Sequence, residues 1–131
     1  MPRNSAEAAR WYRLAADRGF VDAQFNLGQM YFAGPVEMQN SVEAVKWFRR
    51  AADQGNVSAQ YFLGTMYADG RGVPKNYVNA YIWLNLATAQ GDTAVGDVAA
   101  KFRDLVVQNM TPVQLSEAKK FAREWKPKPE R

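Results

Sequence analysis

The side chains that most often carry chemistry are scarce in this chain. Its 131 residues include no cysteine and no histidine. Zinc sites built on these ligands, thiol nucleophiles and Ser-His or Cys-His catalytic pairs are therefore excluded. No pair of carboxylates stands out as a catalytic dyad either. The sequence thus predicts a protein that is not an enzyme and has no catalytic, metal-binding or cofactor-binding residues.

The tryptophans offer a different chemistry, because an indole ring can stack on a sugar or a cation. Trp11, Trp47 and Trp83, however, follow one another at steps of 36 residues and lie beside small alanines. A large aromatic side chain that recurs among small residues is typical of core packing. Burial of each ring contributes on the order of 5 kcal/mol gross. We therefore predict that all three tryptophans are buried.

The net charge of +4 is unevenly distributed. Residues 111–131 hold six Lys/Arg and three Glu, which gives +3, whereas residues 1–110 hold eleven basic and ten acidic residues, which gives +1. A nucleic-acid-binding protein more often carries a basic stripe along one folded face, so no nucleic-acid partner is predicted. Because every apolar run is shorter than the ~20 residues of a transmembrane helix, no membrane span is predicted.

The elements that position these residues form a tandem repeat. The stretch AARWYRLAADRGFVDAQFNLGQMYFAG at 8–34 returns at 44–70 as AVKWFRRAADQGNVSAQYFLGTMYADG, and Ala80, Trp83, Ala87 and Gly91 continue the pattern. A fixed step of 36 residues without gaps predicts a solenoid in which each unit packs on its neighbours. Apolar residues at spacings of three and four predict that every unit consists of helices. The expected fold class is therefore all-α.

Capping residues and glycines place the helices within each unit. We expect helices at about 5–18, 21–33, 41–54, 57–69 and 77–90, then a longer one from a cap at Asp92 or Thr93 to about Asn109. Gly19 and Gly55 are predicted to end helices in the left-handed conformation. Gly28 and Gly64 lie in mid-helix, at a cost of about 1 kcal/mol each against alanine, and therefore predict a close approach by a partner helix.

The end of the chain departs from the repeat. Thr111, Pro112 and Gln114 supply an N-cap, a proline at the first helical position and a capping-box glutamine. The apolar stripe of this helix is Leu115, Ala118, Ala122 and Trp125, with Phe121 beside it. A solenoid needs a terminal element with one polar face, so we predict a capping helix. The predicted organisation is a repeat array at 1–109 (incomplete unit 1–19, units 20–55 and 56–91, degenerate unit 92–109), the capping helix at 110–126 and a frayed basic tail at 127–131.

The first residues indicate where the array begins. PRN at 2–4 matches PKN at 74–76, the end of the loop GRGVPKN, so Met1 stands where Val73 would lie. We expect an artificial start inside a loop, with at least one helix upstream. The first helix then packs on one side only, through Ala8, Trp11, Tyr12 and Ala15. It is expected to fray or to self-associate.

The pattern A-x-x-W-[YF]-R-x-A-A-[DE]-x-G, followed by A-Q-x-x-L-G-x-M-Y-x-x-G, resembles the Sel-one-like repeat (SLR), a relative of the tetratricopeptide repeat (TPR). The resemblance covers residues 2–109. AYIWLNLATAQGD and MTPVQLSEAKKFAREW also resemble the last unit and the closing helix of bacterial members. This resemblance implies an α/α right-handed superhelix, a TPR-like scaffold that recruits other proteins. Members with cysteine-bridged repeats exist, but no disulfide framework carries over to this chain. The loop GPVEMQN lacks a counterpart of Gly72, so its geometry is expected to differ.

By analogy with the TPR superhelix, the AQxxLGxMY helices line the concave face. Their variable outward positions are the predicted partner-binding residues: Asp22, Phe25, Gln29, Phe32, Ser58, Tyr61, Thr65, Asp69, Asp97, Lys101 and Asp104. Phe32 is favoured because its counterparts, Ala68 and Asp104, are not aromatic, whereas packing is the alternative for Phe25 and Tyr61. The basic residues of the other helices are interpreted as a solvated convex face: Arg10, Arg13, Lys46, Arg49 and Arg50.

Three functions are compatible with the sequence. The leading hypothesis is a protein-interaction scaffold or adaptor that holds an extended peptide or a helix in its concave groove. The alternatives are a structural spacer or oligomerisation segment, and a regulatory module of an enzyme or sensor encoded upstream. The sequence does not identify the partner, and the absence of cysteine suits either the cytoplasm or the periplasm.

Overall fold

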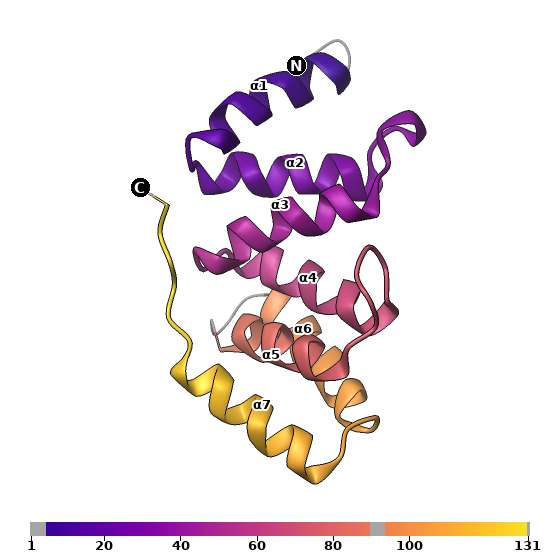
Figure 1. The fold of residues 1–131 in the computed structure, drawn as a ribbon, viewed down its shortest axis with the longest axis vertical. Helices are drawn as coiled ribbons and strands as arrows, with labels where there is room; N and C mark the ends of the chain where they lie inside the picture. Colours follow the sequence, from indigo (N-terminus) through magenta and orange to yellow (C-terminus); the bar gives the residue numbers. More distant parts are fainter. Residues whose placement is uncertain (1–4, 90–93, 131) are drawn as a thin grey trace.

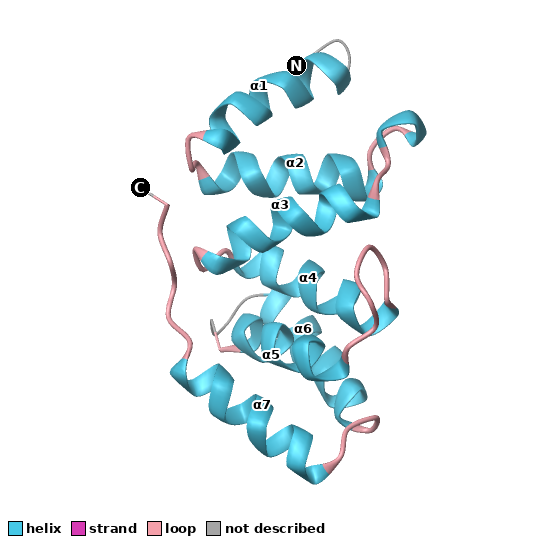
Figure 2. Ribbon diagram, in the orientation of Figure 1, coloured by secondary structure: helices cyan, strands magenta, loops and turns pink. Residues whose placement is uncertain are grey.

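The computed structural model describes residues 5–89 and 94–130, and within them it contains seven α-helices, one short 3₁₀ turn and no strand (Figures 1 and 2). The elements are α1 (Ser5–Asp17), α2 (Val21–Ala33), η1 (Val36–Met38), α3 (Ser41–Asp53), α4 (Val57–Asp69), α5 (Tyr77–Thr88), α6 (Ala94–Val107) and α7 (Pro112–Glu124). The all-α prediction is confirmed. The PRN match at 2–4 and the predicted caps at Asp92 or Thr93 lie outside the described residues.

The helices stack along the long axis of the molecule (Figure 1). From α1 to α6 each helix packs mainly on the next one in the chain, as expected for a solenoid in which contacts are local. The last helix departs from this order, because α7 packs on α5. The array is therefore closed at this end by a helix that folds back onto the last well-packed unit.

Two left-handed glycines make the tight turns between α1 and α2 and between α3 and α4. Gly19 follows α1 with φ 92° and Gly55 follows α3 with φ 99°, as predicted. The longer connections, between α2 and α3 and between α4 and α5, differ from each other. Gly34 after α2 has φ −78°, and the loop that follows forms η1, whereas Gly70 and Gly72 after α4 have φ 68° and 77°. A loop with one glycine thus takes a 3₁₀ turn, and a loop with two takes left-handed conformations.

The mid-helix glycines mark the closest approaches between helices. A Cβ atom added to Gly28 would lie 2.7 Å from Cδ1 of Phe48, so α3 crosses α2 at this point. A Cβ atom on Gly64 would lie 2.7 Å from Cγ of Leu84, where α5 crosses α4. Both distances are too short for a side chain at the glycine position. The prediction of close helix packing is confirmed at both sites.

The recurring tryptophans do not share one environment. Trp47 is 1% exposed and Trp83 is 6% exposed, as predicted for core residues. The prediction is wrong for Trp11, which is 65% exposed. The ring of Trp47 belongs to a cluster with Ala16 from α1 and Leu27 from α2. No helix among the described residues covers the corresponding side of α1, and Trp11 therefore faces solvent.

The last helix has the predicted cap and stripe. Thr111 and Gln114 form a complete capping box, with Pro112 at the first helical position. Ala118 and Ala122 are buried, and Trp125 packs edge-on against Trp83 with ring centroids 6.2 Å apart. Leu115 is half-buried and Phe121 is 59% exposed. None of the described helices has the length and apolar character needed to cross a membrane.

Residues 126–130 correct the prediction of a frayed tail. This segment leaves α7 and runs back along the edge of the stack toward α3 and α2 (Figure 1). The Lys128 N–H donates a hydrogen bond of 2.6 Å to the carbonyl of Asp53, and the Glu130 carboxylate lies 2.7 Å from Arg50 Nη2. Because these partners are distant in the sequence, composition alone could not predict the contact. The tail is docked on the repeat array.

Candidate protein-interaction surface

The predicted partner-binding residues lie on α2, α4 and α6, and we call them the candidate face. Six of them are exposed: Asp22, Gln29, Asp69, Asp97, Lys101 and Asp104. The other five are half-buried: Phe25, Phe32, Ser58, Tyr61 and Thr65. Contacts with neighbouring helices account for most of the second group.

The aromatic members belong to a cluster between the first two units. Phe48 from α3 stacks on Phe62 from α4, with ring centroids 5.2 Å apart and planes inclined by 9°. The ring of Phe32 lies 5.3 Å from Phe62, and that of Phe25 lies 6.0 Å from the same ring. Tyr61 packs edge-on against Phe62 at 5.4 Å. These rings pack α2, α3 and α4 against one another, so Phe25, Phe32 and Tyr61 contribute to the stability of the array.

Phe32 is covered further by a loop residue. The guanidinium of Arg71 lies 4.1 Å from the centroid of its ring. The same guanidinium donates to the backbone carbonyl of Phe32 at 3.0 Å and to Ser41 Oγ at 3.2 Å. Phe32 is thus held by the loop after α4. The sequence comparison with Ala68 could not reveal this contact, because it links two different units.

The exposed part of the candidate face is acidic. It contains four aspartates and one lysine, whereas α1 and α3 carry Arg10, Arg13, Lys46, Arg49 and Arg50. Asp104 forms an exposed ion pair of 3.2 Å with Arg103, which also donates to Asn85 at 3.1 Å. Within the described residues, the carboxylates of Asp22, Asp69 and Asp97 form no ion pair with a basic side chain. The face therefore presents negative charge to solvent.

The arginines of α1 and α3 are more than a solvated face, which corrects the sequence interpretation. Arg13 donates to the hydroxyl of Tyr31 at 2.9 Å, and Arg49 repeats the contact one unit later with Tyr67 at 3.1 Å. Arg50 lies 4.9 Å from the centroid of the Trp47 ring. The aliphatic stems and charged heads of these side chains therefore cover the core tryptophans.

Two fully buried glutamines escaped the sequence analysis. Gln24 and Gln60 are both 0% exposed. Their Nε2 groups donate to the carbonyls of Ala16 at 3.1 Å and Ala52 at 3.2 Å, at the end of the preceding helix. These carbonyls also accept hydrogen bonds from the N–H groups of Gly19 and Gly55. The signal was present in the sequence, because a glutamine recurs at a step of 36 beside an apolar stripe. A polar residue repeated at a core position indicates a buried hydrogen bond.

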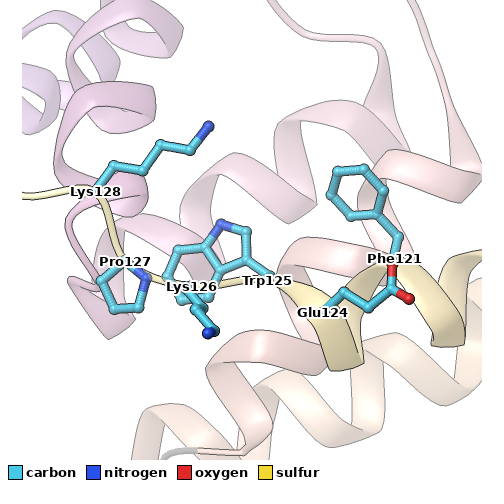
Figure 3. Close-up of a pocket in the computed structure, with 6 residues that line it drawn as sticks. All are labelled: Phe121, Glu124, Trp125, Lys126, Pro127 and Lys128. Atoms are coloured by element: carbon cyan, nitrogen blue, oxygen red, sulfur yellow. The ribbon is translucent and has the colours of Figure 1, made fainter.

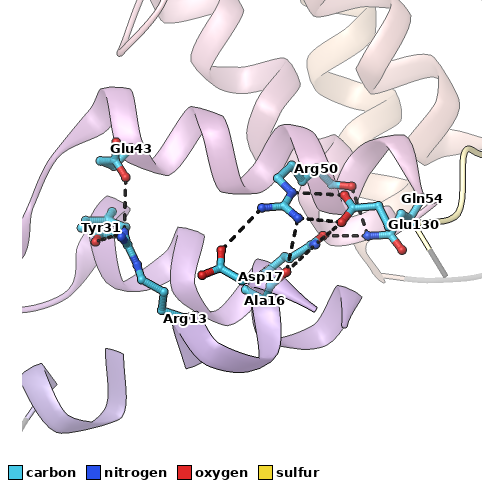
Figure 4. Close-up of polar contacts among 9 residues, drawn as sticks. Arg13, Ala16, Asp17, Tyr31, Glu43, Arg50, Gln54 and Glu130 are labelled. Carbon is cyan, nitrogen blue, oxygen red and sulfur yellow. Dashed lines mark hydrogen bonds and ion pairs between the residues drawn. The ribbon is translucent and has the colours of Figure 1, made fainter. Parts of the chain in front are cut away.

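Gln24 also takes part in the contact with the tail. It donates to the Glu130 carboxylate at 2.9 Å, and its own Oε1 accepts from Gln54 Nε2 at 2.7 Å. Arg50 donates to both oxygens of Glu130, from Nη2 at 2.7 Å and from Nε at 3.2 Å (Figure 4). The hydrogen bond from Arg50 lowers the pKa of Glu130, and the bond to Glu130 raises the pKa of Arg50. Both shifts favour the ion pair.

Two surface hollows lie away from the candidate face. One of about 350 Å³ borders the start of the tail and is lined by residues from Phe121 to Lys128, including Trp125 and Pro127 (Figure 3). The other, of about 290 Å³, lies on the free side of α1. Its lining includes Trp11, Leu14 at 55% exposure and Phe20 at 45% exposure, and we call this the α1-end surface. Among the described residues no group of three or more acidic, cysteine or histidine side chains could hold a metal ion.

The family model of the Sel1 repeat matches this sequence three times, at residues 1–20, 21–56 and 57–92. The chain belongs to the Sel1 repeat family. This confirms the resemblance seen in the motifs and the helical repeat solenoid. Sel1 repeats are generally protein-interaction modules, and the family is typically non-enzymatic.

Solved structures show how the array compares with longer Sel1 proteins. A protective antigen of uropathogenic Escherichia coli strains, which displays an SLR fold, is 32% identical with a TM-score of 0.80, and the match covers 89% of this chain. A Sel1 repeat protein from Oxalobacter formigenes is 41% identical with a TM-score of 0.67, over 72% of this chain. The matches span 24% and 39% of those two proteins. No match was found among curated proteins.

Proposed function

We propose that this Sel1 array is a scaffold that binds a partner protein through the candidate face. The observation that carries the proposal is the excess of exposed carboxylates among the candidate-face residues, at Asp22, Asp69, Asp97 and Asp104, against a single basic side chain at Lys101. A surface of one sign attracts a partner segment of the opposite sign and orients it. The expected partner therefore presents a basic peptide or a basic helix, held along the concave side of the solenoid.

A charge-matched pair of variants tests this proposal. One variant carries Asp22→Asn, Asp69→Asn and Asp97→Asn, and the control carries Glu37→Gln, Glu117→Gln and Glu124→Gln, all of which are exposed. Each variant loses three negative charges, so a general effect of net charge is the same in both. Proteins captured by the immobilised chain are compared after thermal unfolding has shown that all three chains fold.

The candidate-face variant is expected to lose the captured partner, whereas the control retains it. Retention should also weaken as salt is raised, because exposed charge pairs are screened within about 10 Å at 0.1 M salt. Equal capture by the two variants would place the partner on another surface.

The exposed apolar side chains of α1 favour a second function, self-association. The end of the stack at α1 presents a contiguous apolar surface formed by Trp11, Leu14 and Phe20. At the equivalent position 36 residues later, Trp47 is covered by α1 and α2. We propose that the α1-end surface stacks on a second Sel1-type unit, including that of another copy of the chain. An apolar patch at a solenoid end without a polar cap is removed from water in this way.

Light scattering across a range of concentrations tests the second proposal. The wild-type mass is expected to rise with concentration, and Trp11→Glu is expected to remain monomeric. Phe121→Glu is the matched control, because Phe121 is also an exposed aromatic but lies on α7. A wild-type chain that stays monomeric throughout, or a Trp11→Glu chain that still associates, would exclude this surface as the interface.

A further inference from the structure

A single tail carboxylate makes the most concentrated set of polar contacts outside the candidate face. Glu130 accepts two hydrogen bonds from the fork of Arg50 and a third from Gln24. A guanidinium that contacts both oxygens of a carboxylate gives geometric selectivity as well as attraction. The glutamine adds a neutral donor that reaches the carboxylate from the core of the protein.

Contacts within the repeat array also hold these donors. Gln24 is fully buried, and its amide is fixed between the Ala16 carbonyl and the Nε2 group of Gln54. The guanidinium of Arg50 lies over the Trp47 ring, and its Nη1 lies 3.9 Å from an oxygen of Asp17. The donors are therefore oriented before a carboxylate arrives, which reduces the ordering that binding requires.

The segment that brings Glu130 to this site has a backbone suited to extended binding. Pro127 and Pro129 restrict φ to the range of extended chains. Between them, the Lys128 N–H donates to the Asp53 carbonyl at the end of α3, and Pro127 packs against Gly55. One main-chain hydrogen bond, one proline contact and one carboxylate thus define the docked segment.

The corresponding place in the next unit lacks this arrangement. Gln60 repeats the contact of Gln24 with the preceding helix, but its Oε1 has no hydrogen-bond partner among the described residues. Leu86 stands 36 residues after Arg50 and supplies no cation. Both units have the buried glutamine, Gln24 or Gln60. Only the unit with Gln24 has an arginine beside it, Arg50, so among the described residues this unit provides the site for an anion.

We propose that Gln24, Arg50 and Gln54 form a recognition site for the carboxylate of an extended, proline-containing peptide. The chain's own segment 126–130 occupies this site, and a peptide of the same chemistry from another protein chain binds there when the segment is displaced. The site lies at the α1–α2 and α3–α4 turns and is separate from the candidate face. It is therefore independent of the function proposed above.

The full-length Glu130→Gln variant tests the site, because it removes the charge that holds the chain's own segment. The probe is a labelled peptide WKPKPE, amidated so that its glutamate is the single carboxylate, and binding is followed by fluorescence anisotropy. We expect saturable binding to Glu130→Gln and at least tenfold weaker binding to the wild-type chain, whose own segment competes. The same peptide with glutamine in place of glutamate is expected to bind at least tenfold more weakly.

The repeat itself provides the variant that removes the site. Arg50→Leu, in the Glu130→Gln background, introduces the residue that the chain carries at position 86, and it should abolish peptide binding. Lys120→Leu is the matched control for the loss of an exposed cation on α7 and should leave binding unchanged. Arg50→Lys keeps the charge without the fork and should bind with intermediate affinity, which also covers the case in which Arg50→Leu fails to fold.

A second measurement reports on the site directly. The side-chain amide resonances of Gln24 and Gln54 are expected to shift when peptide is added to Glu130→Gln and to stay in place when the glutamine peptide is added. Three results would overturn the proposal: no saturable binding to Glu130→Gln, equal binding of the two peptides, or unchanged binding after Arg50→Leu.

Discussion

Trp11 and Trp47 occupy the same position in consecutive units, yet Trp11 is 65% exposed and Trp47 is 1% exposed. Gln24 and Gln60 differ in a similar way, because Gln24 contacts Glu130 and Gln60 Oε1 has no partner in the described chain. In both pairs the local sequence is nearly the same and the neighbouring elements differ. In a solenoid the repeat fixes the direction of a side chain, and the adjacent unit fixes what that side chain meets.

The largest effect on stability is expected for truncation of Trp47, and a much smaller one for truncation of Trp11. Trp47→Ala should lower the free energy of unfolding by about 3–5 kcal/mol, because it empties a closed site. Trp11→Ala should lower it by less than about 1 kcal/mol, since the ring is mostly in solvent. Urea unfolding of both variants measures the difference. Similar losses for the two would mean that Trp11 is covered in solution.

The next effect concerns the glycines at the helix crossings. Alanine favours a helix by about 1 kcal/mol over glycine, yet Gly28→Ala and Gly64→Ala are each expected to destabilise the protein by about 1–3 kcal/mol. The ring of Phe48, which a Cβ on Gly28 would meet, is stacked on Phe62, and a Cβ on Gly64 would meet Cγ of Leu84 and, at 3.2 Å, the backbone oxygen of Ala80. Neither crossing has room without a shift of its neighbours, so both variants should unfold at a lower temperature than the wild-type chain. A gain in stability for either variant would show that the helices can separate at that crossing.

The buried glutamines should differ by a smaller amount. Gln24→Met removes the donor to the Ala16 carbonyl and to Glu130, and the acceptor of the Gln54 amide, at an expected cost of about 1–3 kcal/mol. Gln60→Met breaks one donated hydrogen bond and also removes an acceptor that has no partner, so its cost should be lower. Chemical denaturation compares the variants. Equal costs would indicate that the tail contact adds nothing to the stability of the array.

The smallest effect is the pH dependence of the tail contact. Arg50 lowers the pKa of Glu130, so the contact contributes fully above the ordinary glutamate pKa of about 4.3 and is lost as the pH falls through the lowered value. The other charged groups near this carboxylate are Asp17, Asp53 and Lys128. Burial raises the pKa of Asp53, so this neighbour becomes neutral earlier during acidification.

Hydrogen exchange at the Lys128 amide follows this transition, because that N–H is bonded to Asp53 in the docked segment. Protection is expected to fall in acid for the wild-type chain. Glu130→Gln should show low protection at every pH. A wild-type amide whose protection does not change with pH would show that the backbone contact persists without the carboxylate.

The sequence by itself determined the helices, the repeat and the role of several single residues. Periodicity and capping signals placed helices such as 21–33 and 57–69 within their observed bounds, because these signals act within a few residues. Gly28 and Gly64 revealed the helix crossings, since a glycine in mid-helix costs stability that only a close contact offsets. The family followed from the same local pattern.

The tertiary structure decided which repeated residues are covered and which surfaces remain free. Trp11 is exposed although its repeat counterpart Trp47 is buried. The contacts of Arg71 with Phe32 and of Arg50 with Glu130 join residues that are not at corresponding repeat positions. A repeat pattern records what the units share, whereas these contacts depend on the ends of the array and on how the chain returns along its edge. The sequence therefore predicted the solenoid, and the packing of its ends set the surfaces that it offers to a partner.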